Sequence, residues 1–265
     1  MSDWLGLKDK VVVITGAGGG LGAEMARAFA AEGASIVLLE RDLPRAEAVA
    51  GELRKNGGKS LAIGCDTSDA ASVEAAATRA SKEIGPADAL LNTAAILRPG
   101  TLDTLSAADW NAQIAVNLTG YLLCAQAFGR AMLARGSGAL VHVTSIAASE
   151  PQPFSGAYSV TKAGVAMLSR QLAYEWGPKG IRSNALAPGL VRTPMSEAFY
   201  QAPGVAERRA NMVPARRVAT PKDMADVALW LCSERSSYVT GQEIIVDGGL
   251  AQTIMGSVPR PGFSG

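Results

Sequence analysis

The residues in this sequence best suited to chemistry are a tyrosine and a lysine four positions apart, Tyr158 and Lys162, with Ser145 thirteen positions upstream of the tyrosine. The apolar spacing around them predicts a helix, and a step of four residues places both side chains on one helix face. A nearby ammonium favours phenolate over phenol, so a tyrosine, whose ordinary pKa is about 10, could act as an acid or base closer to neutral pH. Tyrosine and lysine also fall four apart by chance on many helices, so this interpretation needs support from the rest of the chain.

A glycine-rich segment lies between a predicted strand and a predicted helix at residues 15–23, with the sequence Thr-Gly-Ala-Gly-Gly-Gly-Leu-Gly-Ala. Glycines allow the backbone to turn sharply and to approach a pyrophosphate, and the following helix offers its N-terminal amides to the negative charge. The spacing fits Gly-x-x-x-Gly-x-Gly at positions 16, 20 and 22 and also a register that begins at Gly18, so both registers stay open. No lysine follows the glycines, which argues against a nucleotide triphosphatase loop. The segment predicts a dinucleotide-binding turn.

Glu40 ends the second predicted strand, about 20 residues beyond the glycines, where dinucleotide-binding folds place an acidic residue. Its carboxylate can accept hydrogen bonds from both hydroxyls of an adenosine ribose and repels a 2'-phosphate, which favours NAD over NADP. Arg41 is the next residue, and a basic side chain there is one way to hold the 2'-phosphate, so NADP stays open.

Short apolar runs alternate with longer amphipathic stretches along the whole chain. The predicted strands cover residues 11–15, 35–39, 60–64, 88–92, 139–145, 181–186 and 243–246. The predicted helices cover residues 20–32, 43–56, 69–84, 106–134, 155–177 and 221–232, with helix-start signals at Ser106 and at Thr220 before Pro221. Near-continuous apolar strands are typical of parallel sheets covered on both faces. We predict a Rossmann-type α/β fold, a doubly wound parallel sheet of about seven strands, in a single domain over residues 1–265.

Two segments interrupt this alternation. Residues 190–219 contain three prolines, and an irregular insertion of this length in a compact domain is often functional, so we interpret it as a substrate lid. Its arginines either meet an anionic substrate or lie on a solvated helix face, and we favour the second interpretation; they are Arg208, Arg209, Arg216 and Arg217. Residues 250–265 are predicted to form an irregular C-terminal tail.

The composition excludes several classes of function. With 25 basic and 24 acidic residues, the chain has no charge excess that would favour nucleic acid or a membrane surface as a partner. The first residues contain no apolar leader and no apolar run is long enough to span a membrane, so we expect a cytoplasmic protein. The three cysteines lack CxxC spacing, and the single histidine, His142, falls in an apolar run typical of a core position. We therefore expect neither a metal site nor serine-histidine catalysis.

Taken together, these motifs resemble the short-chain dehydrogenase/reductase family, from about residue 7 to residue 249. Further motifs support the resemblance in the same order along the chain: Cys65-Asp66, Val116-Asn117-Leu118-Thr119-Gly120, Asn184-Ala185-Leu186-Ala187-Pro188-Gly189, Thr193 and Val246-Asp247-Gly248-Gly249. The family usually has Asn-Asn-Ala-Gly after its fourth strand, whereas this chain has Asn92-Thr93-Ala94-Ala95. We expect a small local adjustment of the contacts there.

The resemblance implies hydride transfer between NAD(H) and a small-molecule secondary alcohol or ketone, with Tyr158 as the proton donor or acceptor at the substrate oxygen. Ser145 would hydrogen-bond the same oxygen. Lys162 would lower the pKa of Tyr158 and hold the nicotinamide ribose, and Asn117 would anchor a water in a proton relay. The helices at 106–134 and 155–177 would pair with symmetry mates in a homotetramer. A non-catalytic dinucleotide-binding sensor is the alternative from another class.

The resemblance also assigns cofactor and substrate contacts. Asp66 would meet the adenine beside the backbone of Thr67, and Thr193 would meet the nicotinamide carboxamide. The expected cofactor-binding residues are Gly16, Gly18, Gly20, Leu21, Gly22, Glu40, Arg41, Asp66, Thr67, Asn92, Ala94, Tyr158, Lys162, Pro188, Gly189, Val191 and Thr193. The expected substrate contacts are Ser145, Gln152, Tyr158 and Leu190.

The class of substrate stays open at this stage. Other residues expected around the substrate mix apolar and polar side chains: Leu97, Arg98, Ala147, Glu150, Phe154, Met195, Phe199 and Tyr200. The apolar part suits an aromatic, alicyclic or steroid-like alcohol. Glu150 and Gln152 suit a sugar or polyol, and the lid arginines suit a 3-oxoacyl thioester, for which NADPH would be the reductant.

Overall fold

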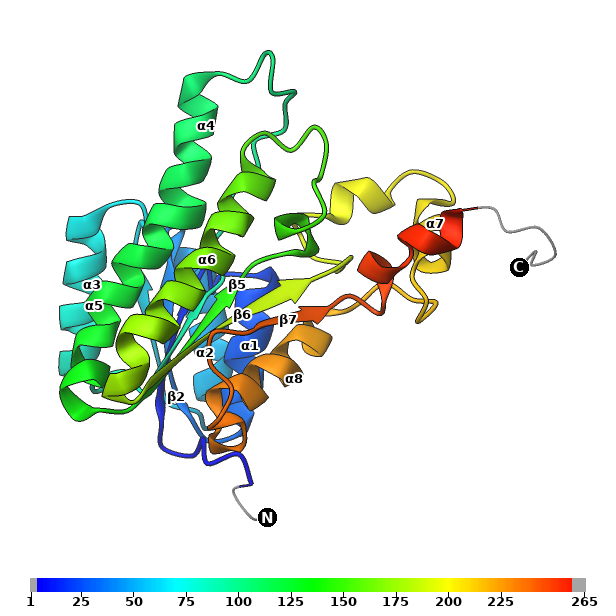
Figure 1. The fold of residues 1–265 in the computed structure, drawn as a ribbon. Coiled ribbons are helices and arrows are strands. Elements are labelled where there is room, and N and C mark those ends of the chain that lie inside the picture. Colours follow the sequence, from blue (N-terminus) through cyan, green and yellow to red (C-terminus); the bar gives the residue numbers. More distant parts are fainter. Residues whose placement is uncertain (1–3, 259–265) are drawn as a thin grey trace.

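The computed structural model describes residues 4–258 and contains one seven-stranded sheet in the order β3-β2-β1-β4-β5-β6-β7 (Figure 1). The strands are β1 (Val11–Thr15), β2 (Ser35–Glu40), β3 (Ser60–Gly64), β4 (Ala89–Asn92), β5 (Gly138–Val143), β6 (Ile181–Pro188) and β7 (Glu243–Val246). Every pair of neighbouring strands is parallel. The prediction of a doubly wound parallel sheet of about seven strands is confirmed.

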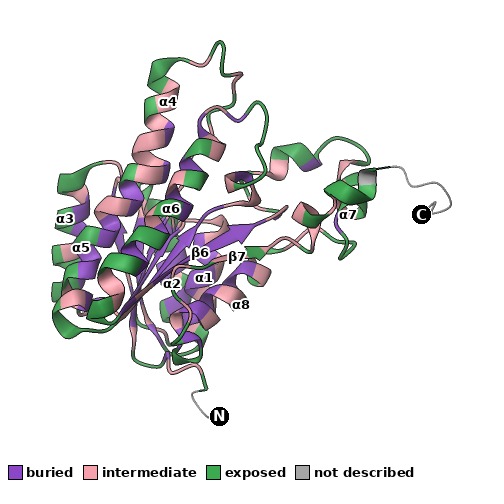
Figure 2. Cartoon of the chain, in the orientation of Figure 1, coloured by how far each residue is buried: buried purple, intermediate pink, exposed green. Residues whose placement is uncertain are grey.

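Helices cover both faces of the sheet (Figure 1). One face carries α1 (Gly20–Ala31), α2 (Leu43–Lys55) and α8 (Pro221–Cys232), and the other carries α3 (Ala70–Glu83), α5 (Gly120–Arg135) and α6 (Tyr158–Trp176). Figure 2 shows the buried residues concentrated along the strands and on the helix sides that face them. In the described part of the chain, no helix combines the length and apolarity needed to cross a membrane.

The burial of β1 illustrates how the sheet is built. Val12 and Ile14 contribute to the apolar cluster that contains α1 and α8 residues, whereas Val11 and Val13 contribute to the cluster on the opposite face. Successive side chains of a strand point to opposite faces, so a strand that is apolar at every position needs cover on both sides. All five residues of β1 are buried accordingly.

The order of the strands reverses between β1 and β4, because β2 and β3 extend the sheet in one direction and β4 to β7 extend it in the other. Connections leave adjacent strands toward opposite faces at such a point, which opens a crevice at the carboxyl ends of the strands. The glycine turn after β1, residues 93–95 after β4 and Ser145 after β5 all lie at this edge of the sheet.

The segment predicted as one helix over residues 106–134 has three parts. It consists of α4 (Ala107–Ile114), a π-helical turn (Ala115–Thr119) and α5. The π-helical turn is only five residues long and is itself largely apolar, so the pattern did not separate it from the helices on either side; it contains Asn117. The predicted helix starts are confirmed, since Ser106 Oγ accepts from the Asp109 amide at 3.0 Å and the Asp223 carboxylate accepts from the Thr220 amide at 2.8 Å.

Other boundaries differ from the prediction by a few residues. The helix predicted from residue 155 begins at Tyr158, and the strand predicted to reach Ser145 ends at Val143, because Ser145 caps a short 3-10 turn (Ile146–Ala148). The predicted lid, residues 190–219, is partly helical, with a 3-10 turn (Glu197–Tyr200) and α7 (Val205–Met212). The start of the predicted tail forms 3-10 turns (Leu250–Gln252 and Ile254–Ser257), and residues 259–265 lie outside the described residues.

The packing of the glycine turn against α1 generates a stability prediction. A Cβ at Gly22 would lie 2.5 Å from the Gly16 carbonyl oxygen and 2.8 Å from Thr93 Oγ1, so Gly22→Ala should lower the free energy of unfolding by about 1 to 3 kcal/mol. Gly51→Ala is the matched control: an added Cβ meets nothing within 4 Å, and alanine favours the helix by about 0.5 to 1 kcal/mol. Urea unfolding measures both. A Gly22→Ala variant as stable as the natural protein would contradict the close packing described here.

Candidate active site

A single cavity of about 1080 Å³ follows the carboxyl edge of the sheet from the glycine turn to the lid. Most of the predicted site residues line it: Gly16, Gly20, Leu21, Gly22, Glu40, Arg41, Asp66, Thr67, Ala94, Ser145, Gln152, Tyr158, Lys162, Pro188, Gly189, Leu190, Val191 and Thr193. Gly18, Asn92 and Asn117 instead support residues of the wall. Phe154, expected near the substrate, is 70% exposed and is not among the lining residues.

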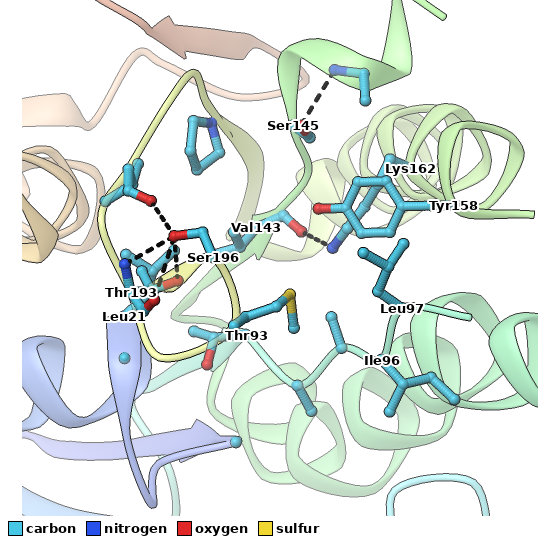
Figure 3. Close-up of a pocket in the computed structure, with 18 of the residues that line it drawn as sticks. Leu21, Thr93, Ile96, Leu97, Val143, Ser145, Tyr158, Lys162, Thr193 and Ser196 are labelled. Carbon is cyan, nitrogen blue, oxygen red and sulfur yellow. Dashed lines mark hydrogen bonds between the residues drawn. The ribbon is translucent and has the colours of Figure 1, made fainter. Parts of the chain in front are cut away.

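Tyr158, Lys162 and Ser145 converge on this cavity (Figure 3). Tyr158 is the first residue of α6 and Lys162 follows one turn later, with its Nζ 5.6 Å from the centre of the Tyr158 ring. Ser145 comes from the end of β5, where its Oγ accepts from the Ala147 amide at 3.1 Å. The end of β5 and the start of α6 therefore bring a hydroxyl, a phenol and an amine together.

Burial is the main cause of the pKa shifts of Tyr158 and Lys162. It raises the pKa of Tyr158, which the Ser145 hydroxyl partly offsets, and it lowers the pKa of Lys162 to about 7. The pKa of Tyr158 is thus shifted in the direction opposite to our expectation. Burial stabilises the neutral forms of both groups, so the amine supplies less positive charge than an exposed lysine would.

Lys162 is held by two acceptors beneath the cavity. Its Nζ donates to the Val143 carbonyl at 2.7 Å and to the Tyr121 hydroxyl at 3.2 Å, and that hydroxyl donates to the same carbonyl at 3.1 Å. Burial raises the pKa of Tyr121 well above its ordinary value, so it stays a neutral phenol. Sequence reasoning missed Tyr121, whose one signal was its position one helical turn beyond Asn117.

Asn117 acts on the loop after β4. Its Oδ1 accepts from the Ile96 amide at 2.8 Å, and its Nδ2 donates to the Ile96 carbonyl at 2.9 Å. A second contact of Nδ2 reaches Thr161 Oγ1 on α6 at 3.4 Å. The completely buried Asn117 side chain thus links the π-helical turn, the loop and α6.

The glycine turn is tied to the divergent segment after β4. Gly16 and Gly20 have φ of 62° and 56°, the left-handed region that favours glycine. Thr93 donates from Oγ1 to the Thr15 carbonyl at 2.5 Å, and Thr15 Oγ1 accepts from the amides of Thr93 and Ala94 at 3.0 and 3.1 Å. Threonine at position 93 therefore fastens this segment to the end of β1.

The acidic residues expected at the adenosine end are fixed by backbone and hydroxyl groups. Glu40 Oε2 accepts from the Gly18 amide at 3.1 Å and Oε1 accepts from the Asp42 amide at 3.2 Å. Hydrogen bonds from Ser68 lower the pKa of Asp66. Arg45, which sequence reasoning missed, also lines the cavity and lies against Gly18 and Gly19.

His142 lies below the site and is completely buried, as expected of a core histidine. Burial lowers its pKa to about 3, so it is neutral. Asn92, opposite it on β4, donates to the Tyr121 carbonyl at 3.2 Å and lies 3.1 Å from His142 Nδ1. Asn92 and His142 therefore support the floor of the cavity around Tyr121.

Comparisons with known proteins agree with this arrangement. A family model described as enoyl-(acyl carrier protein) reductase matches residues 16–251. The D-threitol dehydrogenase of Mycolicibacterium smegmatis is 37% identical over 243 residues, 92% of this chain and 93% of that protein. The galactitol 2-dehydrogenase (L-tagatose-forming) of Cereibacter sphaeroides is 40% identical over 239 residues, 89% of this chain and 92% of that protein. The structure of a gluconate 5-dehydrogenase from Burkholderia cenocepacia in complex with NADP and tartrate has a TM-score of 0.89 at 33% identity, covering 93% of this chain and 97% of that chain.

These features define an oxidoreductase of the dinucleotide-binding class: the strand order, the glycine turn where that order reverses, and a serine, a tyrosine and a lysine in one cavity. The chain belongs to the short-chain dehydrogenase/reductase family, whose members bind NAD or NADP. It is an oxidoreductase that acts on a hydroxyl group or the corresponding carbonyl.

The buried lysine generates a prediction about stability and pH. The pKa of Lys162 is about 7 in the folded protein and about 10.4 in an unfolded chain, so between these values the unfolded state binds more protons. Stability without added NAD should therefore rise above pH 7, by up to about 1.4 kcal/mol per pH unit, and Lys162→Met should remove that rise.

Urea unfolding of both proteins between pH 7 and about 8.5 measures this difference. The pH range ends there because of the three cysteines. Burial raises the pKa of the Cys65, Cys124 and Cys232 thiols in the folded protein. Above about pH 8.5 the thiols of the unfolded chain ionise first, and this difference lowers the free energy of unfolding. Equal pH slopes for the two proteins would show that Lys162 keeps an ordinary pKa in the folded state.

Proposed function

We propose that this protein is an NAD-dependent dehydrogenase of a small secondary alcohol, with Tyr158 as the acid or base at the reacting oxygen. The observation that carries the proposal is one cavity that joins the Tyr158, Lys162 and Ser145 group to the glycine turn and Glu40. A dinucleotide laid along that cavity from Glu40 would bring its nicotinamide toward Tyr158.

The residues of the cofactor half fit a dinucleotide. The glycine turn packs too tightly against the rest of the chain to take side chains, since a Cβ at Gly18 would lie 2.9 Å from the Glu40 side chain and one at Gly22 would lie 2.5 Å from the Gly16 carbonyl oxygen. Its backbone therefore borders the cavity directly at Gly16, Gly20 and Gly22, as close approach to a pyrophosphate requires. Glu40 would accept from the ribose hydroxyls and Asp66 would meet the adenine, with Thr193 at the carboxamide. Bound NAD accepts the hydride and, in its oxidised form, brings positive charge that lowers the pKa of a nearby phenol.

The side chains of the protein would transfer the proton of the substrate hydroxyl. Tyr158 would take it from the substrate hydroxyl during oxidation and return it during reduction, while the Ser145 hydroxyl orients the same oxygen. Lys162 would use its remaining donor capacity to hold the nicotinamide ribose, because Val143 and Tyr121 already accept hydrogen bonds from its Nζ. Asn117 holds the loop at Ile96, and we assign it the anchoring of a relay water.

We further propose that the protein is cytoplasmic and forms a homotetramer through α4, α5 and α6. Three apolar side chains on α6 support the assembly, because Val160, Met167 and Tyr174 are 49%, 57% and 85% exposed and recur every seven residues. Residues seven apart lie on one face of a helix. We also assign residues 190–219 the role of a lid in a single-domain enzyme.

The role of Tyr158 predicts a separation of binding from chemistry. Tyr158→Phe removes the proton-transfer group but leaves the cavity shape, so we expect turnover to fall by about 10² to 10⁴ while NAD affinity stays near that of the natural protein. NADH absorbance with a panel of alcohols measures turnover, and a fluorescence titration measures binding. Retained turnover in the variant would remove Tyr158 from the mechanism, and NAD binding by the natural protein without turnover on any alcohol would favour the sensor alternative.

The position of Glu40 predicts the choice of cofactor. Its carboxylate lies at the turn and would repel a 2'-phosphate, so kcat/KM should be higher with NAD than with NADP. Glu40→Ser should reduce this ratio about tenfold or more, as expected for loss of a charge-assisted hydrogen bond. Glu32→Gln, at the exposed end of α1, is the control and should leave the ratio unchanged. A natural protein that prefers NADP would assign Arg41 the dominant role instead.

A further inference from the structure

The four lid arginines have different surroundings. Arg217 pairs with Asp223 at 2.5 Å, Arg216 donates to the Asn211 carbonyl at 3.0 Å, and Arg208 is exposed. Arg209 alone among these four lines the cavity. The sequence favoured a solvated helix face for all four arginines. That interpretation suits Arg208, Arg216 and Arg217 better than it suits Arg209.

Arg209 rests on an aromatic platform built by the preceding turn. Its Cζ lies 4.7 Å from the centre of the Tyr200 ring and 5.2 Å from the centre of the Phe199 ring. Stacking of this kind holds a planar guanidinium in one orientation and leaves its edge available to a planar anion. The platform thus prepares Arg209 to bind a ligand group at low entropic cost.

The guanidinium edge of Arg209 has no acceptor among residues 4–258. Among the described residues, no carboxylate forms an ion pair with Arg209 and no oxygen accepts a hydrogen bond from it, although the side chain is half-buried. The neighbouring Arg192, which also contacts the Tyr200 ring, is paired with Glu197 at 2.7 Å. A guanidinium has five N–H donors, so a half-buried one at a cavity wall is suited to an anion brought by a ligand.

The Tyr200 hydroxyl is a second observation that points to a ligand. Tyr200 lines the cavity and is 9% exposed, and its buried oxygen has no hydrogen-bond partner in the part of the chain that the structure describes. Buried hydroxyl groups nearly always have a partner. Arg209 lines the same cavity with its Cζ 4.7 Å from the Tyr200 ring, so an anion held by Arg209 is the partner that we assign to this hydroxyl.

The charges of the cavity agree with an anion at the lid end. At the adenosine end, Arg41 and Arg45 balance the carboxylates of Glu40 and Asp66. At the substrate end, Arg98 lies 3.9 Å from Asp109, and Arg209 shares the cavity wall with the single lining carboxylate of Glu150 and has no ion pair of its own among the described residues. We propose that Arg209, with Tyr200, binds a carboxylate on the substrate, so that the substrate is a hydroxy acid or the corresponding keto acid. This assignment rests on the proposed function and names the substrate class of the same site.

Tartrate and threitol form a matched pair of probes, because both have four carbons and two central hydroxyls but end in carboxylates and hydroxymethyl groups respectively. Calorimetric titration of the NAD-saturated protein should give tartrate an affinity about tenfold or more above that of threitol. Arg209→Gln should remove this advantage, lowering tartrate affinity about tenfold to a hundredfold. Arg208→Gln, one residue away and exposed, should leave it intact, and Tyr200→Phe should lower it to a smaller degree.

Three outcomes would overturn the assignment. The first is equal binding of tartrate by Arg209→Gln and the natural protein, and the second is a natural protein with no preference for tartrate over threitol. The third is an Arg209→Gln variant that loses NAD affinity while its affinity for tartrate is unchanged, which would place the guanidinium on the cofactor pyrophosphate. If NAD itself fails to bind, the proposed function is contradicted separately, and the same titrations of the protein without NAD still decide the role of Arg209.

A kinetic comparison tests the same point during turnover. Gluconate and glucitol differ only at carbon 1, a carboxylate in the first and a hydroxymethyl group in the second. For such pairs, Arg209→Gln should raise KM for the acid with little effect on the neutral alcohol, whereas a general disturbance of the lid would change both alike. Equal losses for acid and alcohol would therefore contradict the assignment.

Discussion

The site depends on keeping the lysine amine in the protein interior. Lys162 is 1% exposed, and transfer of an ammonium into such surroundings is costly unless acceptors replace the lost water. The acceptors come from two other elements, the carbonyl of Val143 at the end of β5 and the hydroxyl of Tyr121 on α5. One nitrogen thus contacts both β5 and α5 from α6, one turn beyond Tyr158.

A second set of contacts joins the two halves of the cavity. The segment after β4 is bonded through Thr93 and Ala94 to Thr15 at the start of the glycine turn, and through Ile96 to Asn117. The cofactor half and the catalytic half therefore share one short loop. A movement of this loop would change the shape of the cavity at both ends. Asn117 does not line the cavity, but it affects the shape of the cavity through this loop.

Local spacing predicted the strands, the glycine turn and the placement of Tyr158 and Lys162 on one helix face, because each depends on residues near one another in sequence. The alternation of strands and helices along the whole chain then predicted the parallel sheet. Other features depend on contacts between distant elements. The role of Tyr121 requires α5 to pack beside α6, and the distinction of Arg209 from Arg208 requires the path of the lid. The pKa of Tyr158 is raised in the protein alone, contrary to the expected effect of the nearby lysine, because the sequence does not show how deeply the phenol itself is buried.

The π-helical turn at residues 115–119 has a consequence for how the protein can change over evolutionary time. Each residue turns an α-helix by about 100°, so one extra residue in a single turn rotates everything after it relative to everything before it. The π-helical turn therefore rotates the side chains of α5 about the helix axis relative to those of α4. Because of this rotation, Asn117 contacts Ile96 while Tyr121 contacts Lys162. Substitutions on the sides of α4 and α5 that face away from the site would leave both of these contacts in place.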